Sequence, residues 1–116
     1  MGGLPAISRY YEQATAPHYR AVRKPVRDER AEALRNLSRE VEAVLAESRT
    51  WDSDVRLAAL VEPEQSAARG AVAEFRASLN DLHAAAAMSD MTGLRRQYAR
   101  VMACSRHLSE VPAIGE

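Results

Sequence analysis

The spacing of apolar residues constrains the fold more than any other feature of this chain. In four separate segments, apolar residues recur at alternating intervals of three and four. Residues with this spacing lie on one face of an α-helix, so each segment is predicted to form an amphipathic helix with one buried face. The apolar content is rich in alanine and poor in aromatic residues, which favours closely packed helices over strands. The sequence therefore predicts an all-α protein.

Prolines mark the boundaries of the first two helices. Pro17 interrupts the first segment, which we expect to be one kinked helix or two short ones. Within that segment, His18 falls on the apolar face and is expected to be a packed core residue. Lys24-Pro25 ends the segment, because the residue before a proline avoids the helical region. The second helix is predicted to start at Val26 or Arg27.

The second apolar face is interrupted at residues 50–54. Asp52 and Asp54 are good N-cap residues, and they predict an extra short helix over Asp54–Val61. Trp51 lies in this break. We expect it to cover one end of the core; the alternative is that it is presented to a partner.

The last two helices are predicted to form a hairpin. Glu62-Pro63 opens the third helix, and Ser89 or Asp90 is expected to cap the fourth. The connection is short, so the two helices should be antiparallel neighbours, with residue 83 opposite about residue 97.

Together these segments predict a single domain over residues 1–116, folded as an up-down-up-down four-helix bundle. The side chains expected in its core are Ile7, Tyr11, Leu34, Leu37, Val41, Val44, Val72, Phe75, Leu79, Leu82, Leu94, Tyr98, Val101 and Leu108.

The final helix carries the only cysteine and a histidine three residues later, in the segment Cys104-Ser105-Arg106-His107. Residues 94–107 resemble the last helix of cytochrome c-prime-like haem bundles, which leads into Cys-x-x-Cys-His. The resemblance implies a haem bound with His107 as the iron ligand and Cys104 beside it; with one thiol, a second thioether bond is absent. The helical phase instead puts Cys104 about 80° from the centre of the buried face and His107 about 140° from it. On that phase, Cys104 is a core-edge residue and His107 lies on the surface.

Basic residues offer a second candidate site. Arg95, Arg96 and Arg100 line the outer face of the last helix together with Arg106, and another basic run occupies residues 20–30. Adjacent faces of this kind would suit an acidic protein, a small anionic ligand such as phosphate, or RNA; the alternative is an ordinary solvated surface. The formal net charge is zero, from 16 basic and 16 acidic residues, which disfavours a nucleic-acid partner.

Motifs that carry catalytic chemistry are missing from the sequence. It has no glycine-rich phosphate loop and no His-Glu-x-x-His, and one cysteine excludes an intramolecular disulfide and a Cys-rich zinc site. The chain is therefore predicted to be non-catalytic, without a cofactor. Its predicted function is that of a protein-interaction module, either for another protein or for a homodimer formed through an alanine-rich helix face. Haem binding for electron transfer or gas binding is the alternative.

No hydrophobic run is long enough to span a bilayer, and residues 1–13 lack the pattern of a signal peptide. The expected protein is soluble and cytoplasmic. It would be periplasmic if Met1-Gly2-Gly3 replaces a cleaved leader.

Overall fold

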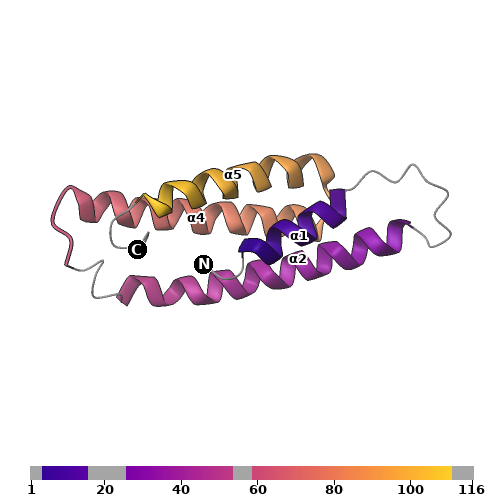
Figure 1. The fold of residues 1–116 in the computed structure, drawn as a ribbon, viewed down its shortest axis with the longest axis horizontal. Coiled ribbons are helices and arrows are strands. Elements are labelled where there is room, and N and C mark those ends of the chain that lie inside the picture. Colours follow the sequence, from indigo (N-terminus) through magenta and orange to yellow (C-terminus); the bar gives the residue numbers. More distant parts are fainter. Residues whose placement is uncertain (1–3, 16–25, 54–58, 111–116) are drawn as a thin grey trace.

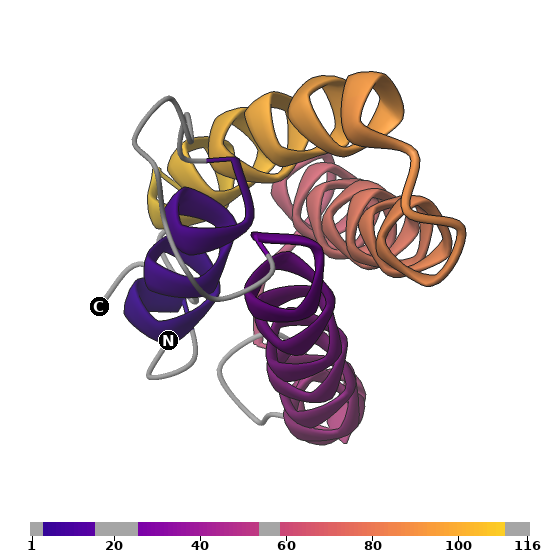
Figure 2. The ribbon, with the colours of Figure 1, turned by 90° about the vertical axis from the view of Figure 1, so that its right-hand side faces the viewer.

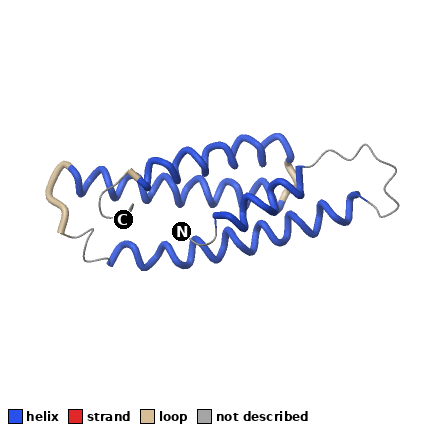
Figure 3. The backbone as a smooth tube through the Cα atoms, in the orientation of Figure 1, coloured by secondary structure: helices blue, strands red, loops and turns tan. Residues whose placement is uncertain are grey.

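The structure, a computed structural model, describes residues 4–15, 26–53 and 59–110. Those residues form four α-helices and one 3-10 helix, namely α1 (Leu4–Thr15), α2 (Val26–Ser48), η1 (Arg49–Ser53), α4 (Glu64–Ala87) and α5 (Met91–Ser109). These ranges contain no strand (Figure 3). The predicted all-α four-helix fold is confirmed.

The helices form an up-down-up-down bundle. Each helix runs opposite to the one before it in the chain (Figure 1). Along the bundle axis, the helices occupy four corners in the order α1, α2, α4 and α5 (Figure 2). Helix α2 packs against α1 and α4, and α4 packs against α5. The predicted topology is therefore confirmed for the described residues.

The buried core contains Phe75 and all the large aliphatic residues that the spacing predicted. These are Ile7, Leu34, Leu37, Val41, Val44, Val72, Phe75, Leu79, Leu82, Leu94, Val101 and Leu108. Each large side chain of this kind contributes about 1.5–3 kcal/mol when it is fully buried. Alanines complete the core at Ala14, Ala33, Ala68, Ala71, Ala85 and Ala86.

The two predicted core tyrosines are only half-buried, which corrects that part of the prediction. Tyr11 of α1 and Tyr98 of α5 stack face to face, with ring centroids 3.7 Å apart and planes 4° apart. The Tyr98 hydroxyl donates a hydrogen bond to Ser8 Oγ at 2.8 Å. A tyrosine has an apolar body and a polar tip, so the stacked rings can link α1 to α5 while neither residue is fully buried.

The turn between α4 and α5 is fixed by backbone and side-chain hydrogen bonds. Ser89 N donates to Ala86 O at 3.2 Å, and Asp90 N donates to Ala85 O at 3.0 Å. With Ser89 at φ 54°, this is a Schellman ending in which serine takes the place usually held by glycine. Asp90 then caps α5, because its carboxylate accepts a hydrogen bond from Gly93 N at 3.0 Å. Of the two predicted caps, Asp90 is the one that is used.

The predicted antiparallel register of this hairpin is also confirmed. Arg100 Nη1 of α5 lies 2.5 Å from Asp81 Oδ2 of α4. This ion pair agrees with the expectation that residue 83 lies opposite about residue 97.

Helix α2 ends where the sequence predicted a break. Residues 49–53 tighten into η1, and the Arg76 guanidinium of α4 donates hydrogen bonds to the Ser48 carbonyl and, at 3.0 Å, to Ser48 Oγ. One carbonyl at the end of α2 is thereby satisfied from a neighbouring helix. Trp51 is half-buried, 6.0 Å from Phe75 between ring centroids, so it covers one end of the core as predicted.

The predicted extra helix over Asp54–Val61 is wrong at its end, since residues 59–61 are not helical. Residues 54–58 lie outside the described residues, as do Pro17, His18 and Lys24-Pro25. Helix α2 starts at Val26, as expected. Helix α1 ends at Thr15, where Arg30 Nε of α2 donates to Ala14 O at 3.0 Å.

Candidate interaction surface

The two residues of the haem hypothesis occupy the positions that the helical phase predicted. His107 is exposed on α5, and Cys104 is half-buried and packed against the core. An iron ligand within a helical bundle projects inward from a helix that lines the cofactor cavity. His107 faces solvent, and the three pockets described among these residues are lined by other side chains. The described residues therefore do not fit an enclosed haem at this position.

The predicted arginine face of α5 is divided between two neighbouring helices. Arg95, Arg96 and Arg100 are all exposed. Arg100 pairs with Asp81 of α4. Arg95 lies on the α1 side, where burial raises the pKa of Tyr11 and the positive charge of Arg95 partly lowers it again. Arg95 and Arg100 therefore do not belong to one patch.

Most of the basic side chains at residues 20–30 lie outside the described residues. Within the described part, Arg30 is half-buried and bound to the end of α1. Trp51 packs on Phe75. Most of the surface of these two side chains is used inside the bundle.

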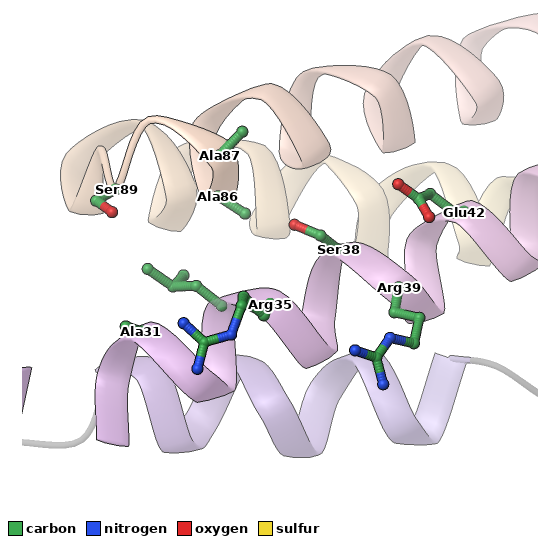
Figure 4. A pocket seen from close by; sticks show the side chains of 9 residues that line it. Ala31, Arg35, Ser38, Arg39, Glu42, Ala86, Ala87 and Ser89 are labelled. Carbon is green, nitrogen blue, oxygen red and sulfur yellow. The ribbon is translucent and has the colours of Figure 1, made fainter. Parts of the chain in front are cut away.

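A polar groove of about 420 Å³ lies between α2 and the end of α4. Arg35 and Arg39 extend from the same side of α2, and Ser38 points toward Ala86 of α4 (Figure 4). Glu42 closes the groove, with its carboxylate 2.9 Å from His83 Nε2. Two guanidinium groups next to one carboxylate give the groove the chemistry of a weak anion site, and its charged side chains are exposed.

Within residues 4–15, 26–53 and 59–110, no three His, Cys, Asp or Glu side chains gather closely enough to hold a metal ion. Over the same ranges, none of the helices combines the length and the apolar character needed to cross a membrane.

The outer face of α4 carries a continuous row of small side chains, directly opposite its buried face. We call this row the outer strip. Its members are Ser66, Gly70, Ala73, Ala77, Asn80, Ala84 and Ala87, and all are exposed. They alternate at intervals of four and three, so they follow the same seven-residue period as the core. Figure 2 shows that the other three helices all lie to one side of α4, and the exposure of the outer strip places it on the opposite side.

Charged residues border the outer strip in an ordered way. Arg69 and Arg76 lie on the flank that faces α2, and Glu74 and Asp81 lie on the flank that faces α5. At the C-terminal end of α4, Met88 is 77% exposed. The outer strip thus has one basic border, one acidic border and an exposed methionine at its end.

Sequence reasoning did not single out the outer strip, although it expected an alanine-rich face to mediate self-association. The signal was present as a second row with heptad spacing in residues 66–87. It was hidden because alanine on an outward face is also typical of an ordinary helix surface.

Comparison of the chain with protein-family models, with curated proteins and with solved structures finds no match.

Proposed function

We propose that this chain is a non-catalytic protein-interaction module that docks a partner helix on the outer strip of α4. One observation carries the proposal. The longest helix of the bundle leaves an unbroken row of small, mostly apolar residues on the surface. Small side chains let a second helix approach the backbone closely, and heptad spacing matches the way in which helices pack side by side.

The placement of the other candidate residues supports an interaction function. Cys104 and His107 do not face a common cavity, and Arg100 pairs with Asp81 of α4 whereas the charge of Arg95 acts on Tyr11 of α1. The surface that remains for a partner therefore lies on α4, and not at the predicted arginines or Trp51.

Site-specific photo-crosslinking in the native host tests this surface. A photoreactive amino acid replaces Ala73 on the outer strip or, as a matched control, Ala43 on α2, which is exposed and helical in the same way. We expect a protein adduct from position 73 and none from position 43. Absence of an adduct at position 73, or equal adducts at both positions, would contradict the proposal.

Haem titration separates this function from the alternative expected from the sequence. Under the interaction proposal, added haem gives no Soret band that depends on His107. A band that is present in the natural chain and absent in His107→Ala would favour the haem alternative, with Cys104→Ala as the control for the thiol.

A further inference from the structure

We propose that the partner on the outer strip is a second copy of this chain, with the two α4 helices side by side and parallel. This inference rests on the interaction function proposed above and adds the identity and orientation of the partner. Two independent observations carry it, one steric and one electrostatic.

The steric observation is Gly70. Glycine destabilises a helix interior relative to alanine, and it is usually explained by a left-handed conformation or by a close neighbour. Among the described residues, Gly70 has neither explanation. Its φ is not positive, and a Cβ added there would meet no atom of the described chain within 4 Å. A glycine that faces open space within an exposed row gives an outside backbone room to approach.

The electrostatic observation is the order of charges along the borders of the outer strip. Arg69 precedes Glu74 by five residues, and Arg76 precedes Asp81 by the same interval. In a parallel coiled coil, the residues that flank the seam pair across the interface with this offset. Each copy would therefore place Arg69 next to Glu74 of the other copy, twice by symmetry.

The same charges select the orientation. In a parallel pair, the two-fold axis runs along the helices, and the basic border of one copy meets the acidic border of the other. In an antiparallel pair, the two-fold axis is perpendicular to the helices, so basic meets basic and acidic meets acidic. Like charges at these positions are destabilising, which disfavours the antiparallel pair.

Arg69 and Glu74 are the charged pair on which the inference depends, since both are exposed. Arg76 is hydrogen-bonded to Ser48 at the end of α2, and Asp81 pairs with Arg100. Their main contribution is therefore to the overall charge of the basic and the acidic border. Asn80 lies in the seam itself. A polar residue at a seam position favours the register in which it meets its own copy.

Sedimentation velocity from micromolar to millimolar concentration measures the association directly. We expect a reversible dimer for the natural chain. Ala77→Arg, at the centre of the outer strip, should abolish it, whereas Ala43→Arg on α2 should leave it unchanged. Circular dichroism of each variant checks that the helices are intact. A strictly monomeric natural chain, or equal effects of the two arginines, would overturn the inference.

A charge swap tests the pairing of the borders. Arg69→Glu and Glu74→Arg should each lower the association constant about tenfold, because each creates two like-charge contacts. The double variant Arg69→Glu/Glu74→Arg should restore it to within about threefold of the natural value. If the double variant is as weak as the two single changes combined, the two residues do not meet across the interface.

Gly70→Gln provides a signature with two opposite signs. Glutamine forms helices better than glycine and faces open space in the monomer, so the melting temperature at low concentration should rise. The same larger, uncharged side chain should lower the association constant of the dimer. A rise in both the melting temperature and the association constant would contradict close approach at Gly70.

Disulfide trapping reports the orientation. In a Cys104→Ser background, Gly70→Cys should form a disulfide with its own copy if the helices are parallel, because equivalent positions then face each other. If the helices were antiparallel about Ala77, Gly70→Cys would instead trap Ala84→Cys from the other copy. That mixed product, without the self-disulfide, would overturn the parallel arrangement.

The crosslinking and sedimentation experiments fail in distinguishable ways. A monomer in sedimentation combined with an adduct to a different protein from position 73 keeps the interaction function and rejects the second copy. Absence of any adduct from position 73 rejects both.

Discussion

The inner and outer faces of α4 repeat residues at the same heptad spacing but carry side chains of opposite size. The inner face presents Phe75, Leu79 and Leu82, which are fully buried. The outer face presents glycine, alanine, serine and asparagine, which are exposed. Burial free energy scales with the apolar area removed from water, so the large face turns inward and the small face is left outside. Periodicity makes a face available for packing, and side-chain size decides which partner it packs against.

The largest expected difference is in the free energy of unfolding when one residue of each face is substituted. Phe75→Ala should lower the free energy of unfolding by about 3–5 kcal/mol, because it leaves a cavity in the core. Ala77→Arg on the outer strip should change it by less than about 0.5 kcal/mol. Urea unfolding at micromolar concentration measures both values. Comparable losses would mean that the outer strip is part of the monomer's own packing.

On the basic border of the outer strip, the cost of a substitution in unfolding free energy should depend on what the side chain contacts. Arg76→Leu should cost about 1–3 kcal/mol, since the carbonyl of the buried Ser48 loses a charged donor. Arg69→Leu, one heptad earlier on the same border, is the matched control and should stay within about 0.5 kcal/mol. The same urea experiment applies. If both leucine variants are neutral, Arg76 does not stabilise the end of α2.

The two helical glycines sharpen the comparison further. Gly70→Ala should stabilise the monomer by about 0.5–1 kcal/mol, because alanine is the better helix former and the new methyl clashes with no atom of the described residues. At Gly93, a Cβ would lie 2.9 Å from Asp90 Cγ and displace the carboxylate that caps α5. Gly93→Ala should therefore leave the melting temperature unchanged, since losing the Asp90 cap costs about 1 kcal/mol and cancels the gain in helix propensity. In an Asp90→Ala background, Gly93→Ala should raise the melting temperature. A higher melting temperature for Gly93→Ala in the natural chain would contradict the capping role of Asp90.

The smallest expected effect is a pH dependence from Tyr11. Burial raises the pKa of Tyr11 above the ordinary value of 10.0, and the nearby positive charge of Arg95 only partly lowers it. A raised pKa means that the fold favours the neutral phenol. Stability from this group is therefore complete below pH 10.0 and is lost as the pH rises through the folded-state pKa. Tyr11→Phe should flatten the alkaline decline in the free energy of unfolding, and an unchanged slope would contradict the effect.

The fold could be predicted from the sequence because it depends on local patterns. The spacing of large apolar residues identified the buried faces, and prolines and caps located most helix ends. Tyr11 and Tyr98 are less buried than their spacing predicts, because spacing gives the direction of a side chain but not how far it extends. The exposure of Cys104 and His107 agrees with the prediction, since a helical wheel determines which side of α5 they occupy.

The candidate surface could not be predicted in the same way. Arg95, Arg96 and Arg100 share the outer side of a single helix, and only the positions of α1 and α4 reveal that they face different neighbours. The outer strip is defined by the packing of α2 and α5 on α4, which leaves only one side of α4 exposed. A row of alanines has no meaning for binding until its exposure and the charges along its borders are known.

The shortness of α1 has a consequence for motion. It contains 12 residues against 23 in α2, and it buries only Ile7 and Ala14 completely. A helix of this length is not stable by itself in water. It should therefore detach as one unit at a lower free energy than global unfolding, while the other three helices stay together. Native-state hydrogen exchange should then resolve two cooperative units within this one bundle, with the amides of α1 exchanging first.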